Sequence, residues 1–213
     1  MKIKVNPILA LISVLLLFLF ASVTFAADAG SPVGVLQNVA NQMIADLQRN
    51  KVTLKSNRQY VYSLANKLVV PHVDVDEMSR RVLPPQTWSQ ATAAQRSAFE
   101  HQFIELLVHT YASALASYTD QTVEFYPIRG GYAGRHTVEV NSQITSTSGA
   151  PPVDVKYRLI NEGGSWKLFD MSVEGVSVIE SFRSQFADVL AQGDINALTQ
   201  RLAEHNAHPA ESD

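Results

Sequence analysis

The stretch Val153-Asp-Val-Lys-Tyr-Arg-Leu159 alternates apolar and polar side chains without a break. Because successive side chains of a strand point to opposite faces, this alternation predicts a strand with one covered and one solvated face. Segments of the same kind, separated by short links rich in glycine or proline, are found at residues 122–125, 137–140 and 166–173. We therefore predict an antiparallel sheet over residues 121–173 that covers one face against the rest of the protein.

The chain before the sheet is expected to be helical over residues 32–118. Ser31-Pro32 has the form of a helix cap followed by proline at the first helical position, and apolar residues recur every four positions after it. Thr92 and Gln95 form a capping box ahead of the longest helical pattern. The later helices in this part are expected at residues 57–69, 75–83 and 92–118.

The long helix sets the architecture. At 100° per residue, its apolar side chains between Phe99 and Leu115 cover an arc of about 200°, which is too wide for a single neighbour. After Gly175 a second capping box, Ser177-x-x-Glu180, begins C-terminal helices over residues 177–204. Helices, then strands, then helices predict an α+β fold in which helices pack in the concavity of a curved antiparallel sheet. A curved sheet and straight helices do not meet everywhere, so we expect an internal hydrophobic cavity.

Composition excludes several classes of protein. The 213 residues carry a net charge of −3 and no cysteine, which argues against a nucleic-acid surface and removes disulfides, thiolate nucleophiles and zinc ribbons. Residues 1–26 combine two lysines, an apolar run and a small residue at Ala26, as in a secretory signal cleaved after Ala26. Without them the net charge is −5. We expect an exported protein with one domain over 27–204 and a polar tail over 205–213.

Two groups of residues have the spacing of metal ligands. His72 with Asp74, Asp76 and Glu77 lies at the start of a helix, where carboxylates complement the helix dipole. Residues His101, Glu105 and His109 share one helix face, which is the only polar strip that this helix has for water. We interpret the first group as a helix cap and the second as a solvated strip, and we expect no metal and no cofactor.

Two residues have the placement of catalytic groups. Ser177 lies between a strand and a helix, but the nucleophile elbow requires glycine two positions later, where Ile179 stands. Asp170 is expected to share a strand face with Trp166 and Leu168, and a carboxylate among apolar residues is a candidate for a raised pKa. We interpret Ser177 as a helix cap and expect no enzyme activity. The surplus of apolar side chains fits either a filled core or a cavity for an apolar ligand.

Four segments together resemble a known family: WSQATAAQR at 88–96, FIELLVHTYASALASY at 103–118, WKLFDMSVEGVS at 166–177 and FRSQF at 182–186. In order and spacing they resemble the MlaC family, also called the toluene-tolerance periplasmic proteins, over residues 33–203. One departure is Leu83-Pro84-Pro85, where the family more often has leucine followed by glycine.

The resemblance implies a periplasmic carrier of glycerophospholipid with a sheet of the nuclear-transport-factor-2 (NTF2) type. Family members move lipid between an outer-membrane lipoprotein–porin complex and an inner-membrane ABC transporter with an MCE-domain subunit, which maintains outer-membrane lipid asymmetry. A monomer that contacts these complexes transiently is expected, with the acyl chains inside and the headgroup outside.

From pattern and position we predict the wall of the lipid cavity and place Arg80 and Arg81 near the headgroup. The predicted wall residues are Leu68, Val70, Leu83, Phe103, Leu107, Tyr111, Leu115, Val155, Tyr157, Val173 and Val176. Two alternatives stay open: an NTF2-like enzyme that acts on a hydrophobic substrate through Asp170, and a periplasmic adaptor whose core is filled.

Overall fold

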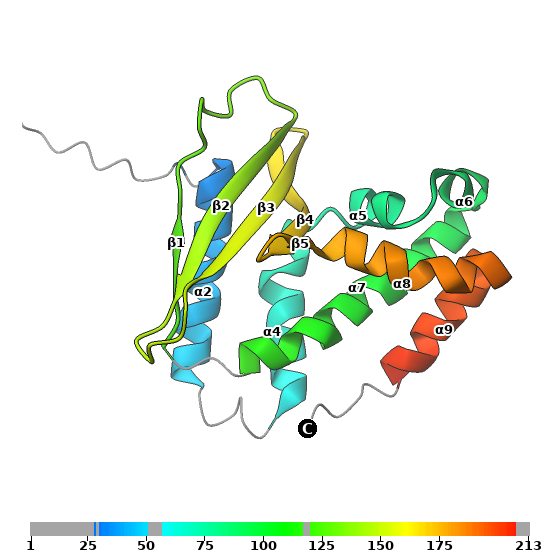
Figure 1. The fold of residues 1–213 in the computed structure, drawn as a ribbon, viewed down its shortest axis with the longest axis horizontal. Coiled ribbons are helices and arrows are strands. Elements are labelled where there is room, and N and C mark those ends of the chain that lie inside the picture. The colour runs from blue at the N-terminus through cyan, green and yellow to red at the C-terminus, as the bar shows by residue number, and fades with distance from the viewer. Residues whose placement is uncertain (1–27, 29, 51–56, 117–119, 208–213) are drawn as a thin grey trace, which may run out of the picture.

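A computed structural model describes residues 28, 30–50, 57–116 and 120–207 (Figure 1). The expected signal segment, 1–26, lies outside the described residues. The helices are α2 (Pro32–Arg49), α4 (Arg58–Leu68), the 3-10 helix η2 (Val70–His72), α5 (Val75–Val82), α6 (Pro85–Gln90), α7 (Ala93–Ala116), α8 (Val178–Gln192) and α9 (Ile195–Ala207). The strands are β1 (Thr122–Phe125), β2 (Thr137–Thr145), β3 (Val153–Glu162), β4 (Ser165–Val173) and β5 (Val176–Ser177).

The five strands form one antiparallel sheet in the order β1-β2-β3-β4-β5, which confirms the predicted α+β class. One face of this sheet carries Phe125, Ile144, Tyr157 and Met171, and we call it the inward face. The strand pairings place Glu139, Lys156 and Arg158 on the opposite, outward face. In Figure 1 the sheet and α2 form one side of the molecule, α5, α6, α8 and α9 form the other, and α4 lies between them.

A bulge between β3 and β4 changes which face Asp170 occupies. Leu159 pairs with Leu168 and Arg158 pairs with Asp170, so Phe169 has no partner across the ladder. An extra residue in one strand reverses the alternation beyond it. Asp170 therefore lies on the outward face with Arg158, and the expectation that it shares a face with Trp166 and Leu168 is wrong.

Side-chain caps begin the helices where the sequence predicts them. The hydroxyl of Ser31 accepts the amide of Gly34 at 3.0 Å, and the side chain of Asn57 caps α4. In the capping box of α7, the Gln95 amide donates to the Thr92 hydroxyl at 3.3 Å and the Thr92 amide donates to the Gln95 side chain at 2.8 Å. Helix α6, which begins at Pro85, is not among the helices that the sequence predicts. Proline at the first helical position also begins a helix.

The main core forms around α7, which packs against α4, α5 and α9, so its wide apolar arc is covered on more than one side. Phe99 and Phe103 are fully buried, and both rings contact Phe186 of α8 edge-on. Helix α9 continues to Ala207, beyond the expected end of the C-terminal helices at residue 204. Near its end, the side-chain amide of Asn206 donates a hydrogen bond to the backbone carbonyl of Gln102 in α7 at 2.9 Å. Among the described residues, no helix is long and apolar enough to cross a membrane.

Candidate functional site

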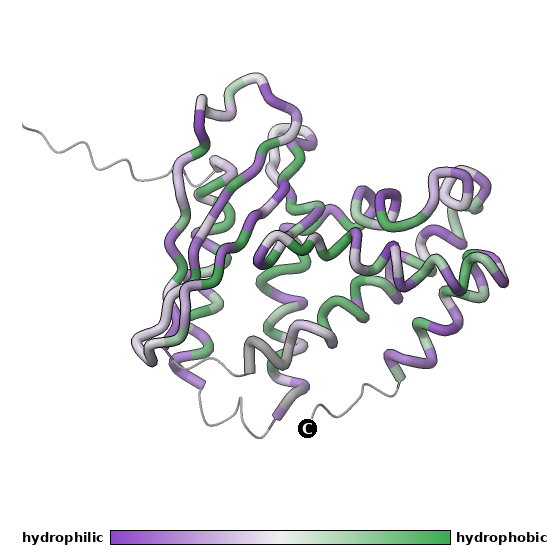
Figure 2. Tube along the Cα trace, viewed as in Figure 1, coloured by the Kyte–Doolittle hydropathy of each residue, from purple (hydrophilic) through white to green (hydrophobic). Residues whose placement is uncertain are grey.

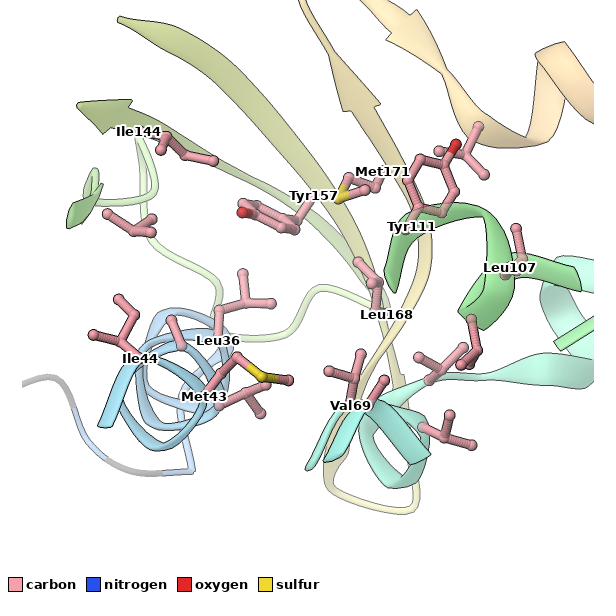
Figure 3. A pocket seen from close by; sticks show the side chains of 18 of the residues that line it. Leu36, Met43, Ile44, Val69, Leu107, Tyr111, Ile144, Tyr157, Leu168 and Met171 are labelled. Carbon is pink, nitrogen blue, oxygen red and sulfur yellow. The ribbon is translucent and has the colours of Figure 1, made fainter. Parts of the chain in front are cut away.

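A cavity of about 520 Å³ lies between the inward face of the sheet and helices α2, α4 and α7. Figure 3 shows Leu36, Met43 and Ile44 of α2 facing Tyr157 and Ile144 of the sheet across this space. The residues that line it are Leu36, Val39, Ala40, Met43, Ile44, Leu47, Ala65, Val69, Val70, Val73, Met78, Ile104, Leu107, Val108, Tyr111, Gln121, Val123, Phe125, Ile144, Tyr157, Leu168, Met171 and Val178. The volume falls in the range of small-molecule sites.

The wall is almost entirely apolar. Among the described residues that line the cavity, only Gln121, Tyr111 and Tyr157 carry polar side-chain atoms, and none is charged at neutral pH. A cavity with such walls offers water too few hydrogen-bond partners and suits an apolar ligand. The arrangement can enclose hydrocarbon, but it provides no ion pair for a charged group.

Each wall element contributes through its own periodicity. On α2, Leu36, Ala40, Met43 and Leu47 follow one another at intervals of three or four residues and therefore share one helix face. The six sheet residues of the wall all lie on the inward face. Val123 and Phe125 alternate along β1, whereas Leu168 and Met171 lie on either side of the bulge in β4. Figure 2 shows hydrophobic and hydrophilic segments in turn along α2.

The two tyrosines of the wall stay neutral at physiological pH. Burial raises the pKa of Tyr157 above its ordinary value of 10.0. Burial, and after it the charge of Asp170, raises the pKa of Tyr111 as well. Tyr111 is nonetheless 36% exposed, which places it at the rim of the cavity rather than at its floor. Both hydroxyls are thus uncharged hydrogen-bonding groups.

The structure brings together four of the predicted wall residues at the cavity: Val70, Leu107, Tyr111 and Tyr157. The remaining described ones lie elsewhere. Leu68 packs in a small cluster between α2 and α4, and Leu83 and Phe103 belong to the main core. Val155 and Val173 lie on the inward face of the sheet but do not line the cavity. Val176 is 63% exposed. The side chain of Leu115 lies outside the described residues. The contribution of α2 was missed, although its four-residue repeat was visible in the sequence.

The MlaC protein family matches residues 37–204. The chain belongs to the MlaC family. The toluene tolerance protein ttg2D of Pseudomonas putida is 32% identical over 176 residues, covering 83% of this chain and 80% of the relative. The intermembrane phospholipid transport system binding protein MlaC of Haemophilus influenzae is 25% identical over 181 residues, covering 84% of each.

A similar fold is found in a solved structure that contains a phospholipid. The phospholipid-binding protein from Ralstonia solanacearum, determined in complex with a phospholipid, is 31% identical to this MlaC-family chain. The two folds superpose with a TM-score of 0.75 over 85% of this chain and 98% of the other.

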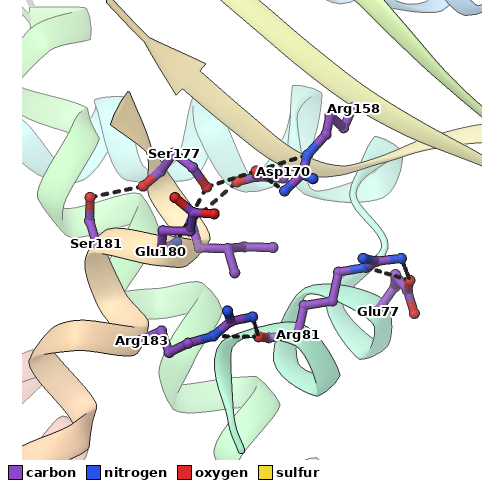
Figure 4. Close-up of polar contacts among 9 residues, drawn as sticks. Glu77, Arg81, Arg158, Asp170, Ser177, Glu180, Ser181 and Arg183 are labelled. Atoms are coloured by element: carbon purple, nitrogen blue, oxygen red, sulfur yellow. Dashed lines mark hydrogen bonds and ion pairs between the residues drawn. The ribbon is translucent and has the colours of Figure 1, made fainter. Parts of the chain in front are cut away.

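The carboxylate of Asp170 is fully buried and saturated with hydrogen bonds in this MlaC-family chain (Figure 4). Oδ2 accepts from the Arg158 guanidinium and from the Ser177 hydroxyl at 2.8 Å, and Oδ1 accepts the Ile179 amide at 3.1 Å. The Ser177 hydroxyl also accepts the Glu180 amide at 3.2 Å, which confirms its role as the cap of α8. Asp170 thus joins β3, β4 and α8 from the outward face, away from the cavity.

The groups with metal-ligand spacing have other partners. Asp74 caps α5 by accepting the Glu77 amide at 2.9 Å. His101 and Glu105 lie 3.7 Å apart on the exposed strip of α7, and the ring of His109 packs against Tyr62 with centroids 4.5 Å apart. In the part of the chain that the structure describes, no three histidine or acidic side chains lie close enough to hold a metal ion.

Glu77 accepts hydrogen bonds from Arg80 and Arg81, the two arginines that are expected from the sequence to lie near a lipid headgroup. Its carboxylate is buried and accepts hydrogen bonds from Arg80 and Arg81 of the same helix. Burial alone raises the pKa of Glu77, but the two arginines outweigh it and hold this pKa below the ordinary value of 4.5. Their side chains are 52% and 37% exposed, so solvent weakens each pair.

Glu77→Gln is expected to lower the free energy of unfolding by about 1–2 kcal/mol at pH 7, because a buried charge-assisted acceptor is lost. Since the folded pKa of Glu77 lies below the unfolded one, this contribution is present above pH 4.5 and is lost as the pH falls through the folded pKa. Urea unfolding of both proteins at several pH values checks this. A difference between them that stays constant down to pH 3 would contradict it.

Proposed function

We propose that this chain binds a glycerophospholipid, with its acyl chains in the cavity and its headgroup in water. The observation that carries the proposal is the 520 Å³ apolar cavity in the fold of a relative that was determined with a phospholipid. The cavity favours this function over an adaptor with a filled core. The outward position of Asp170, with all its hydrogen bonds directed at the protein, favours it over an NTF2-like enzyme.

The energetics of lipid transfer explain the need for such a wall. Each methylene kept from water is worth about 0.8 kcal/mol, so two chains with about 30 methylenes resist entering water by roughly 25 kcal/mol. A carrier must therefore enclose most of both chains. The phosphate, by contrast, is costly to dehydrate unless it is paired, and the wall of the cavity offers it no charged partner.

The test is solvent extraction and mass spectrometry of the protein purified without detergent. We expect phospholipid at close to one molecule per chain, and reloading of the delipidated protein from vesicles. A folded protein that contains no phospholipid and takes up none from vesicles would contradict the proposal.

We further propose that the chain is periplasmic and exported by residues 1–26. It would carry phospholipid between an outer-membrane lipoprotein–porin complex and an inner-membrane ABC transporter with an MCE-domain subunit, and so maintain outer-membrane lipid asymmetry. The name of the Haemophilus influenzae relative, an intermembrane phospholipid transport system binding protein, supports this route. The measurement is transfer of labelled phospholipid from the loaded chain to proteoliposomes that bear the transporter. Equal transfer to vesicles of lipid alone would argue against the route.

A further inference from the structure

A second and more polar pocket, of about 450 Å³, lies beside the connection between β1 and β2, residues 126–136. Its wall consists of Tyr132, Ala133, Gly134, Arg135, His136, Asn161 and Trp166. Asn161 and Trp166 pair with each other next to the β3–β4 turn, whereas Ile144 and Met171 of the lipid cavity lie toward the other end of their strands. No residue of the described chain lines both spaces.

The connection is held in place by its own turns and by the sheet. The Gly131 amide donates to the Ile128 carbonyl at 3.0 Å, and the Arg135 amide donates to the Tyr132 carbonyl at 3.1 Å, which makes two successive turns. The Tyr132 ring meets the Trp166 ring edge-on, with centroids 6.1 Å apart, and Ile128 packs against the same cluster.

The charge of this segment is opposite to that of the chain. Residues 126–136 contain Arg129, Arg135 and His136 and no acidic residue, whereas the whole chain carries −3. Arg81 and Arg158 each have a carboxylate partner, but no ion pair is found for Arg129 or Arg135 within the described residues. The Arg135 guanidinium instead lies over the bare backbone of Gly130, which has a φ of +75° and where an added Cβ would be 3.1 Å from it.

The pocket is rich in donors and poor in acceptors. Asn161 Oδ1 already accepts the Gly164 amide at 3.1 Å, which leaves its Nδ2 group as the donor in a wall that also contains Arg135 and His136. Trp166 is buried and supplies a rigid wall. A guanidinium beside further N–H donors matches the several oxygens of a phosphate group, which it binds in a bidentate manner.

We propose that the pocket beside residues 126–136 binds a phosphate ester, either free in solution or as the headgroup of an anionic phospholipid at a membrane surface. Arg135 and Asn161 hold the phosphate oxygens, and Arg129 adds charge at the edge. The phosphate site is distinct from the lipid cavity, because no described residue lines both. Binding of a phosphate ester in this pocket therefore does not depend on whether the cavity holds a phospholipid.

The experiment uses the fluorescence of Trp166 in the variant Trp88→Phe, which retains it as the only tryptophan. The probes are glycerol 3-phosphate and vesicles of phosphatidylcholine with or without phosphatidylglycerol. A saturable response to glycerol 3-phosphate assigns a soluble ester, and a response only to vesicles with phosphatidylglycerol assigns a membrane headgroup. Either supports the site. Should Trp88→Phe not fold, the indole N–H resonance of Trp166 in the unaltered chain gives the same readout.

Arg135→Gln is expected to weaken the response about tenfold, as for loss of a charge-assisted hydrogen bond. The matched control is Arg201→Gln, which removes the same charge from an exposed position on α9 and should leave binding unchanged. The amount of phospholipid extracted per chain should be equal in both variants. Failure of phosphate binding in this pocket can therefore be distinguished from failure of phospholipid binding in the cavity. The proposal is overturned by the absence of any saturable response to glycerol 3-phosphate and to vesicles with phosphatidylglycerol, or by equal weakening in both variants.

Discussion

Ala40→Trp is expected to reduce the affinity for phospholipid about a hundredfold while the protein stays folded. Ala40 lines the cavity from α2 and is only half-buried, so the larger side chain can enter the cavity without removing any part of its wall. If the indole displaces about four methylenes of lipid, the loss is roughly 3 kcal/mol at 0.8 kcal/mol each, which is about two factors of ten. Extracted phospholipid per chain, and reloading from vesicles, measure the effect.

Ala45→Trp is the matched control, because Ala45 lies on the exposed face of the same helix. It should carry as much phospholipid as the unaltered chain. Thermal unfolding of both variants shows whether α2 still packs on the sheet. Normal lipid content in a folded Ala40→Trp protein would show that the cavity is not where the lipid lies. Leu107→Trp tests the wall from α7, but Leu107 also contacts the main core, so that variant is the less discriminating one.

Asp170→Ala is expected to destabilise the fold by about 3–5 kcal/mol, because two buried donors each lose their acceptor at a cost of about 1–3 kcal/mol, while the partly exposed Arg158 guanidinium adds little. The Ile179 amide and the Ser177 hydroxyl lose their acceptor in the interior, and the N-terminus of α8 loses its link to β4. Urea unfolding measures the change. The remaining folded protein should still contain phospholipid, because Asp170 lies on the outward face.

Glu139→Ala is the control for this change on the same face of the sheet. Glu139 pairs with Lys156 at 3.0 Å, but both side chains are almost half exposed, so its loss should cost less than about 1 kcal/mol. Equal destabilisation by the two substitutions would show that Asp170 is no more than a surface charge. Loss of a catalysed turnover of a hydrophobic substrate in Asp170→Asn, with normal stability, would instead revive the enzyme interpretation.

The elements of the fold were largely predictable because their signals are local. Capping residues such as Ser31, Asn57 and Ser177 determine where helices begin, and alternation identifies strands. The position of Asp170 was not predictable in this way. One unpaired residue, Phe169, reverses the faces beyond it, and nothing in the sequence of β4 marks it as the bulge. Short elements such as α6 and β5 have too few residues to show a period.

The cavity wall was predictable only in part, since periodicity shows which side chains are buried but not what they contact. Phe103 and Leu107 lie one turn apart on the same stripe of α7, yet Phe103 is in the core and Leu107 also faces the cavity. Val176 is apolar, yet it is exposed on β5, the two-residue strand at the edge of the sheet. Such distinctions depend on the distance between elements that are far apart in the sequence.

The apolar stripe of α2 has a thermodynamic consequence. Leu36, Ala40 and Ile44 line the cavity, so a molecule bound in it packs against α2. A ligand that binds only the folded state adds to its stability by mass action, by about 2.7 kcal/mol at a hundred times the dissociation constant. On the proposed function, the melting temperature of this protein therefore reports how much phospholipid it holds, and a partly loaded preparation should melt as two populations.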